Sequence, residues 1–325
     1  MTLAQIQSPA GFIAGDVFPI IPVDFVSDKY YTYDPNVFAR DDVRPRGPRD
    51  TVARIGFTTS QDQYTCVNKA IGTDIPDQVR NNADPAIDAT LQQTASDLLA
   101  AQWRQHLERQ WASNFFTTGI YGASAVGGLG LGTEVSGTAS TPTPGTTIRH
   151  WSDQTNSTPI DDIRAAIRTF QKNSAGIKPN RLVLAAEVAD ALVDHPDIID
   201  RVKYTEGALN DPQMFLTGMA RLFGIERIVV ADAVKATNAE GVTATYDFIQ
   251  GPHALLAYRP ASPSLMTPMT GAIFMHRNNL GSGMAMPTKM WRDEATASDV
   301  YESEAAFDIK ICSKSLGYFF YNAIA

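Results

Sequence analysis

The segment from residue 11 to residue 49 constrains the fold most, because its composition excludes ordinary secondary structure. It holds prolines at positions 19, 22, 35, 45 and 48, and aromatic residues at positions 12, 18, 25, 30, 31, 33 and 38. Proline fixes φ and lacks an amide donor, so the segment cannot form a regular helix or a central strand. Aromatic side chains need burial, yet an extended arm has little interior of its own. The sequence therefore predicts an arm, residues 1–36, that lies across other subunits of an assembly.

The arm and the arginine-rich stretch behind it supply the residues that we expect at a subunit interface. These candidates are Phe18, Phe25, Tyr30, Tyr31, Tyr33, Arg40, Arg44, Arg46, Arg49 and Arg54. Arginine suits interfaces because its guanidinium pairs with carboxylates in a bidentate manner, and the intervening prolines exclude a basic helix. A solvated loop neutralised by Asp41, Asp42 and Asp50 is an equally weighted alternative. A nucleic-acid contact ranks third, because no groove of interleaved aromatic and basic residues follows.

The size and composition of the chain are those of a globular protein. Its 325 residues can bury a large core, and two domains are expected. The net charge of −8 disfavours nonspecific binding of duplex DNA by the whole surface. Two cysteines, Cys66 and Cys312, make no disulfide framework, so a reduced cytosolic setting is expected. The N-terminus lacks the pattern of a signal peptide, and no apolar run reaches ~18 residues, so no contact with a membrane is expected.

A long helix is predicted over residues 85–117. Asp84 is a plausible N-cap, Pro85 fits the first helical position, and Gly119 can end the helix. Such a helix would be ~50 Å long. From Leu99 to Phe115 its apolar residues recur every four positions, so the stripe drifts by ~40° per step and excludes a coiled coil. We therefore expect different faces of this spine helix to meet different partners along its length.

The remainder of the chain predicts an irregular connection followed by a mixed α/β region. Residues 122–158 are rich in Gly, Ser, Thr and Pro and are interpreted as a connection without regular structure. Helices are expected at 159–172, 187–193 and 212–223, and strands at 181–186 and 227–231, with three more in YDFIQ, HALLAY and GAIFMHR. The last two strand-like runs, ESEAAFDIKIC and GYFFY, are expected to return to the sheet of the first domain.

No group of residues predicts catalysis, so no catalytic, cofactor-binding or metal-ligating residue is assigned and no cofactor is expected. The GGLGLG run at 127–132 lacks the strand and helix of a phosphate loop. The five histidines show no metal-ligand spacing, and structural or surface roles are favoured for all of them. Neither cysteine lies in a Cys-x-x-Cys motif, and no Gly-x-Ser-x-Gly elbow is present.

The order of arm, charged excursion, long helix and α/β region resembles the major capsid protein of tailed bacteriophages, with its Hong Kong 97-type fold. The resemblance covers nearly the whole chain, and it is strong through the order of its motifs. They are VFPIIPVDFVSDKYYTYDP at 17–35, YTCVNKAIGTDIPDQVRNNADP at 64–85, RQWASNFFTTGIYG at 109–122, KPNRLVLAAEVADALVDHPDIIDRVKY at 178–204 and FIQGPHALLAYRPASPSL at 248–265.

The resemblance implies an α+β fold with an N-terminal arm, an extended loop, a long spine helix, a peripheral domain and an axial domain. The implied divisions are an arm at 1–36, a loop at 37–70, a peripheral domain at 71–176 and 291–325 that includes the helix 85–117, and an axial domain at 177–290. It also implies a homo-oligomer of hexamers and pentamers that forms an icosahedral shell around double-stranded DNA. A scaffolding protein, a portal, decoration proteins and DNA contacted without sequence specificity are the implied partners. The implied locations are the virion capsid and, during assembly, the host cytoplasm.

Three other interpretations remain. An encapsulin-type nanocompartment would have the same fold but would enclose protein cargo. A soluble α/β enzyme would use residues 181–277 and should show a pocket with convergent polar groups. A tail or decoration protein is disfavoured by the long helix within a two-domain chain. On the capsid interpretation, removal of residues 1–35 is expected to leave a folded subunit that fails to form stable shells.

Overall fold

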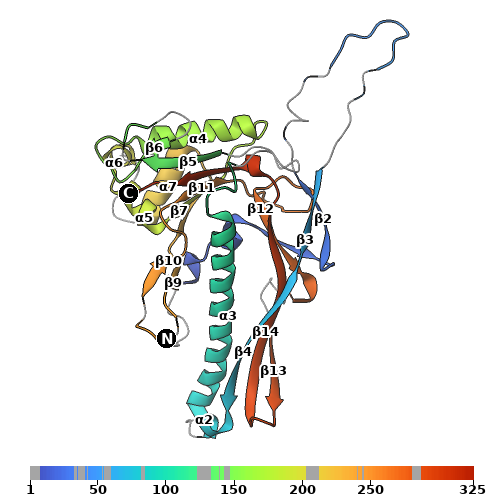
Figure 1. Ribbon diagram of the computed structural model, residues 1–325, viewed down its shortest axis with the longest axis vertical. Coiled ribbons are helices and arrows are strands. Elements are labelled where there is room, and N and C mark those ends of the chain that lie inside the picture. Colours follow the sequence, from blue (N-terminus) through green and yellow to red (C-terminus); the bar gives the residue numbers. More distant parts are fainter. Residues whose placement is uncertain are drawn as a thin grey trace.

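The computed structural model is a mixed α+β structure with two main sheets (Figure 1). It describes residues 8–32, 35, 41, 43–52, 54, 60–81, 85–122, 133–138, 140–142, 147–202, 212–239, 241–243, 245–279 and 287–325. One sheet and the long helix α3 form an elongated part, and the other sheet, with helices α4 to α7, forms the opposite end of the molecule (Figure 1). The predicted α+β class and the three strands after residue 245 are confirmed, whereas the GGLGLG run lies outside the described residues.

The elongated part is a five-stranded sheet with α3 (Pro85–Phe115) running beside it (Figure 1). Its strands are β1 (Ile20–Val23), β4 (Val67–Pro76), β12 (Gly271–His276), β13 (Thr288–Asp293) and β14 (Ser298–Ile311). The fourteen-residue β14 pairs antiparallel with β4, β12 and β13, and β1 lies parallel to β12. The short helix α2 (Asp77–Asn81) closes the far tip of this part.

The second sheet has the strand order β6-β5-β15-β11-β7-β8. Its strands are β5 (Thr133–Thr138), β6 (Thr147–Arg149), β7 (Arg181–Ala185), β8 (Arg227–Ala231), β11 (Ala254–Ala257) and β15 (Gly317–Tyr321). The helices around it are α4 (Pro159–Asn173), α5 (Ala186–Val193), α6 (Pro196–Val202) and α7 (Pro212–Phe223). A separate two-stranded sheet, β9 (Val234–Ala236) with β10 (Tyr246–Phe248), lies between this end and α3 (Figure 1).

Two strand expectations were wrong. The GYFFY run forms β15, which lies between β5 and β11 in the six-stranded sheet, so it does not join the sheet of the first domain. Phe319 and Phe320 are both fully buried, so neither face of this strand is open to solvent. Phe320 packs in the core of the α/β end, and Phe319 packs in the cluster that includes the spine helix. The stretch 122–158 was expected to be irregular, yet it holds β5 and β6, because pairing with β15 outweighs the weak strand propensity of TEVSGT.

The spine helix ends at Phe115, two residues before the predicted end, and its winding stripe meets different partners as expected. Near its start, Ala95 and Leu99 pack with Ile75 and Tyr301. Further along, apolar residues from Trp103 onward join a larger cluster with the arm and both sheets. The prediction of one helix with several partners is therefore confirmed.

Much of the arm packs against its own chain. It begins with the turn η1 (Pro9–Gly11) and α1 (Ala14–Val17), then continues through β1 into β2 (Ser27–Thr32), which pairs with β3 (Ser60–Thr65). Ile13 and Val17 are buried in the same cluster as Trp111. This differs from the expectation of an arm that depends on other subunits, because β1 supplies one strand of the main sheet.

Candidate assembly surface

An exposed excursion extends from the hairpin of β2 and β3. The two strands pair from Ser27 with Thr65 to Thr32 with Ser60, and residues 43–52 lie beyond their ends, away from the body of the molecule (Figure 1). A local turn shapes it, with the Asp50 amide donating to the Gly47 carbonyl at 3.2 Å and Arg46 Nε donating to the Asp50 carbonyl at 2.7 Å. Its apolar members are exposed, with Val43 at 88%. The segment therefore packs little against its own chain, and most of its surface is available for contact with another chain.

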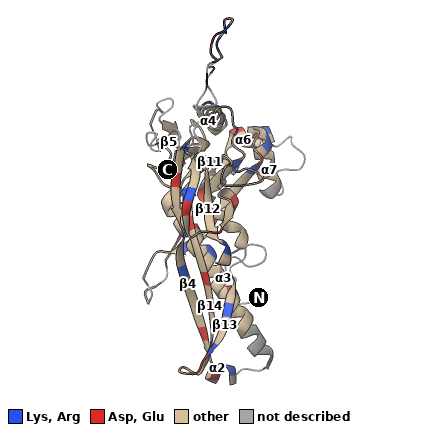
Figure 2. Cartoon of the chain, turned by 90° about the vertical axis from the view of Figure 1, so that its right-hand side faces the viewer, with Lys and Arg blue, Asp and Glu red and all other residues tan. Residues whose placement is uncertain are grey.

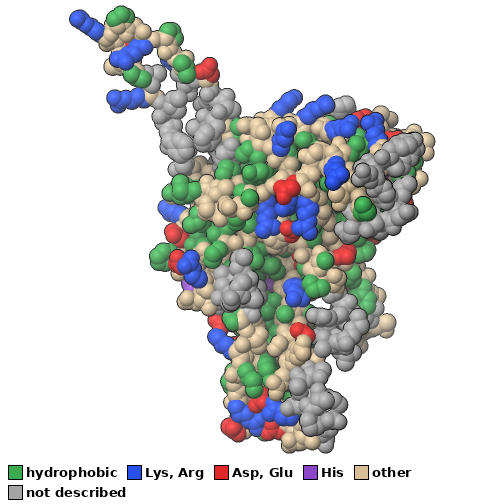
Figure 3. Space-filling view, turned by 180° about the vertical axis from the view of Figure 1, so that it is seen from behind, with side chains coloured by type: hydrophobic (Ala, Val, Ile, Leu, Met, Phe, Trp, Pro, Cys, Tyr) green, Lys and Arg blue, Asp and Glu red, His purple; other side chains and the backbone are tan. Residues whose placement is uncertain are grey.

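The predicted arginines of this excursion are exposed. Arg44, Arg46, Arg49 and Arg54 all have solvent-accessible side chains. Basic side chains crowd the end of the excursion in the space-filling view (Figure 3). Within the described ranges, the ion pairs of the structure include none of these four arginines. Arg40 and Tyr33 lie outside the described residues.

The predicted arm aromatics divide into an exposed pair and a buried pair. Phe25 is 66% exposed and Tyr31 is 37% exposed. Phe18 meets Trp111 edge-to-face at 5.8 Å between ring centroids, and Tyr30 lies 5.1 Å from Phe274. The buried pair therefore has partners within the chain, in contrast to the expectation that arm aromatics lie on neighbours.

Tyr30 shows why the hairpin is held in place. Its hydroxyl lies 3.0 Å from the Ile311 carbonyl and 3.0 Å from Asp62 Oδ2, both of which can accept from it. Burial first, and then the charge of Asp62, raise the pKa of Tyr30 above its usual value, so the hydroxyl stays protonated as a donor. Cys66 and Cys312 lie in the same buried cluster as Tyr30, and both are free thiols. The base of the excursion is thus anchored to the five-stranded sheet.

A second exposed surface, which sequence reasoning missed, lies at the far tip of the elongated part. There β13 is an edge strand, and its Met290 and Trp291 are 57% and 48% exposed. The sequence signal was a tryptophan within a polar run, and such a residue does not show that its strand lies at the edge of a sheet. An exposed edge of this kind is a ready-made surface for another chain.

Ion pairs stiffen the same tip. Arg292 binds Asp77 of α2 and Asp299 of β14, and Arg80 also binds Asp299. Basic and acidic residues lie close together at the α2 end of the chain (Figure 2). The hydrogen bond from Arg80 holds the pKa of Asp299 below its usual range, and that from Arg292 does the same for Asp77. Because both carboxyl pKa values are depressed, these pairs stabilise the tip above the ordinary carboxyl range, and this stability is lost as the pH falls through the depressed pKa values.

Glu108, a second feature that sequence reasoning missed, ties the arm to the spine helix. It is 1% exposed, its Oε2 accepts from the Ala14 amide at 2.8 Å, and Gln250 donates to its Oε1. The residue before α1, Ile13, makes no side-chain cap, so Glu108 supplies the missing acceptor. The sequence signal was an acid three positions before Trp111, on the buried face of the helix.

We predict that the stability of the subunit depends on the protonation of Glu108. Burial raises the pKa of Glu108 to about 7. The folded state therefore holds a proton that the unfolded state has lost, and the contribution of this group to stability falls as the pH rises from about 4.5 to about 7. Urea unfolding at pH 5 and pH 8 measures it. Glu108→Gln should remove on the order of 2 kcal/mol of the pH-dependent difference. An identical pH dependence in both proteins would contradict the assignment.

His195 and His253 are held by hydrogen bonds within the chain. His195 is buried, with its Nε2 3.0 Å from Ser157 Oγ, and His253 Nδ1 accepts from the Asn322 amide at 3.1 Å. In the described ranges, no group of three or more His, Cys, Asp or Glu side chains is placed to hold a metal ion. Among the helices in those ranges, none combines the length and apolar character needed to cross a membrane.

Comparisons with known proteins place this architecture among capsid structures. A phage-related protein of Bordetella bronchiseptica RB50 superposes with a TM-score of 0.69 at 20% identity, covering 98% of this chain and 95% of the other. The mature capsid of bacteriophage PhiM1 gives a TM-score of 0.58 at 12% identity, covering 97% and 88%. The capsid of a native GTA particle gives 0.60 at 12% identity, covering 98% and 92%. The chain therefore has the Hong Kong 97-type capsid fold, as the order of its motifs indicated.

Sequence comparison finds a match over a smaller part of the chain than structure comparison does. No protein-family model matches the chain. Over 101 residues, which are 31% of this chain, it is 30% identical to the major capsid protein of Burkholderia phage BcepMu. The matched stretch is 29% of the length of that relative.

Proposed function

We propose that this chain is the major capsid protein of a tailed phage, a structural subunit with no catalytic role. The observation that carries the proposal is the likeness to solved capsids over nearly the whole chain. A fold alone does not imply a function, so the partial sequence identity to a named major capsid protein adds independent support.

The proposed parts of the subunit follow the sheets. The peripheral domain is the five-stranded sheet with α3, and the axial domain is the six-stranded sheet with α4 to α7. The expected divisions at 71–176, 177–290 and 291–325 do not follow this assignment at three places. Within 71–176, β5, β6 and α4 belong to the six-stranded end. Within 177–290, β12 belongs to the five-stranded sheet, and within 291–325, β15 belongs to the six-stranded sheet. The arm is residues 1–36, and the extended loop is residues 37–70.

Assembly would be homo-oligomeric, with hexamers and pentamers closing an icosahedral shell. Head-to-tail contacts that repeat around an axis close rings, and an extended loop suits them because it reaches a neighbour. The proposed contacts are the exposed loop arginines with Phe25 and Tyr31, which the chain itself leaves uncovered. The further proposed partners are a scaffolding protein, a portal, decoration proteins and packaged double-stranded DNA, with assembly in the host cytoplasm.

Electron microscopy of negatively stained particles tests the proposal, with the protein expressed together with its genomic neighbours and sedimentation as a second measure. Closed shells or capsomer rings are expected. Nuclease-protected DNA inside them would support the phage capsid, whereas shells filled with protein cargo and free of DNA would favour a nanocompartment. A uniform monomer, with every neighbouring gene product present, would contradict the proposal.

The loop is tested within the same experiment. Replacing Arg44, Arg46 and Arg49 together by Ser should reduce the yield of closed shells at least tenfold, because their guanidinium groups lose their partners on the neighbour. The thermal melting of the isolated subunit should not change, since these side chains are exposed. The matched control replaces the same arginines by Lys and separates charge from bidentate geometry. Normal shells from the Ser variant would remove the loop arginines from the interface.

A further inference from the structure

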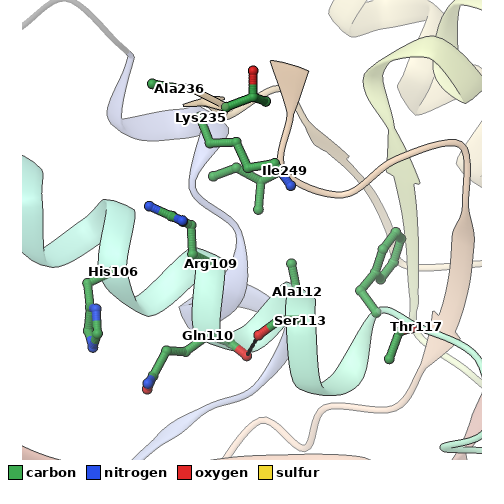
Figure 4. A pocket seen from close by; sticks show the side chains of 11 residues that line it. His106, Arg109, Gln110, Ala112, Ser113, Thr117, Lys235, Ala236 and Ile249 are labelled. Carbon is green, nitrogen blue, oxygen red and sulfur yellow. Dashed lines mark hydrogen bonds between the residues drawn. The ribbon is translucent and has the colours of Figure 1, made fainter. Parts of the chain in front are cut away.

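A pocket of about 800 Å³ lies between the spine helix and the hairpin of β9 and β10, and it opens to solvent (Figure 4). One wall comes from the last turns of α3, and the other comes from β9 and Ile249. The proposed assembly contacts make no use of it. Its volume is in the range of sites that hold a side chain with its flanking groups, and it is far larger than a single ion requires.

The pocket holds two cations from different elements. Arg109 of α3 and Lys235 of β9 lie on the same side of the helix, whereas His106 and Gln110 point to the other side (Figure 4). None of the described residues that line the pocket is acidic. Within the described ranges, no ion pair or hydrogen bond is recorded for the Arg109 guanidinium or the Lys235 ammonium. The nearby carboxylate of Glu108 is directed into the core, where it binds Ala14 and Gln250.

The positive charge continues along the helix. Lys69 Nζ lies 3.0 Å from His106 Nε2 and 2.8 Å from Gln110 Oε1, two residues that also line the pocket. Burial, followed by the charges of Lys69 and Arg109, lowers the pKa of His106, which favours the neutral form of its ring beside these cations. Asp247 of β10 lies opposite Lys235 in the hairpin, and among the described residues no ion pair is recorded between these two. An anion that entered the pocket would therefore meet two cations and one neighbouring carboxylate.

The shape of the pocket selects among anions. Ala112, Phe116 and Ile249 give it an apolar lining, which suits the aliphatic stem of a side chain. A DNA duplex is broad and convex, and its phosphates would reach only the rim of a pocket. The hydroxyls of Ser113 and Thr237 already donate to the Gln110 and Thr245 carbonyls, so recognition depends on the two cations. An aspartate or glutamate side chain fits both the charge and the lining.

We infer that this pocket receives a carboxylate side chain from a second copy of this chain, as an intersubunit site of the proposed shell. The inference rests on the proposed function, which places many copies side by side. The net charge of −8 provides acidic side chains for the contact. Tyr246 lies opposite Ala236 of the pocket wall and is 70% exposed, so the contact has an apolar surface to cover next to the salt bridge.

Zero-length carbodiimide crosslinking of assembled particles tests the inference, because the reagent joins an amine only to a carboxylate in direct contact. Shells are assembled from equal amounts of ¹⁴N and ¹⁵N protein, and mass spectrometry then identifies the partner of Lys235. The expected product is an amide between Lys235 of one isotopic form and an Asp or Glu of the other form. Arg109→Gln should reduce its yield at least fivefold. Lys235→Arg should abolish this product, because it keeps the charge but loses the reactive amine.

The outcomes separate the inference from the function on which it rests. Closed shells in which Lys235 links only within its own copy, or to a different protein, or to nothing, would overturn the inference and leave the shell proposal standing. Protection of Lys235 that nuclease treatment removes would assign the pocket to DNA and also overturn it. Failure to form shells would overturn the proposed function and this inference with it.

Discussion

Deletion of residues 1–35 is expected to abolish the folded subunit. The deletion removes β1 from the five-stranded sheet, β2 from the hairpin and α1 from the core. Arg259 Nη1 donates to the Asp16 carbonyl at 2.6 Å and pairs with its carboxylate at 3.0 Å, and Glu108 binds the Ala14 amide. Arg259 would lose its Asp16 partner and Glu108 would lose its bond to the Ala14 amide, in a core that also loses Phe18. The earlier expectation of a folded subunit without its arm is thereby replaced.

Circular dichroism and a thermal melt of the truncated protein measure this effect. We expect no cooperative transition, because the lost burial and pairing exceed the ~5–15 kcal/mol by which a typical domain is stable. Phe25→Ser is the matched control, since this arm residue is 66% exposed and its replacement should leave the melt unchanged. A soluble truncated protein with a cooperative melt close to that of the full chain would show that the arm is dispensable for folding.

Trp111→Ala is expected to lower the free energy of unfolding by about 3–5 kcal/mol. The side chain is fully buried, with Phe18 at 5.8 Å on one side and Phe116 at 5.4 Å on another. Its removal leaves a cavity where the arm, the spine helix and the sheet meet, so collapse of the surroundings can recover little of the lost packing.

Urea titration of the monomeric subunit measures the effect of Trp111→Ala, and Trp291→Ala is its control. Trp291 is the same residue type but is 48% exposed on an edge strand, so its loss should cost less than about 1 kcal/mol. Trp103→Ala, at 5% exposure, should resemble Trp111→Ala. Equal stability of the parent and the Trp111 variant would show that the stripe of the spine helix does not form the core.

Features encoded by neighbouring residues could be predicted from the sequence. Pro85 and the four-residue spacing of the apolar stripe lie within one helix, so the start of α3 was correct and its end was two residues too long. The exposure of the loop arginines could also be predicted, because proline and charge act locally there. The overall capsid architecture followed from the order of such segments.

Contacts between distant parts of the chain were decided by the tertiary structure. Ile20 pairs with Ile273, and Tyr318 pairs with Thr133, across separations that no local pattern records. These pairings determine which arm aromatics are buried, which sheet receives β15, and that Arg109 and Lys235 face one pocket. The physical reason is that the local sequence shows which side chains must be buried or paired. Which surface buries them, and which residue pairs with them, depends on the folded topology.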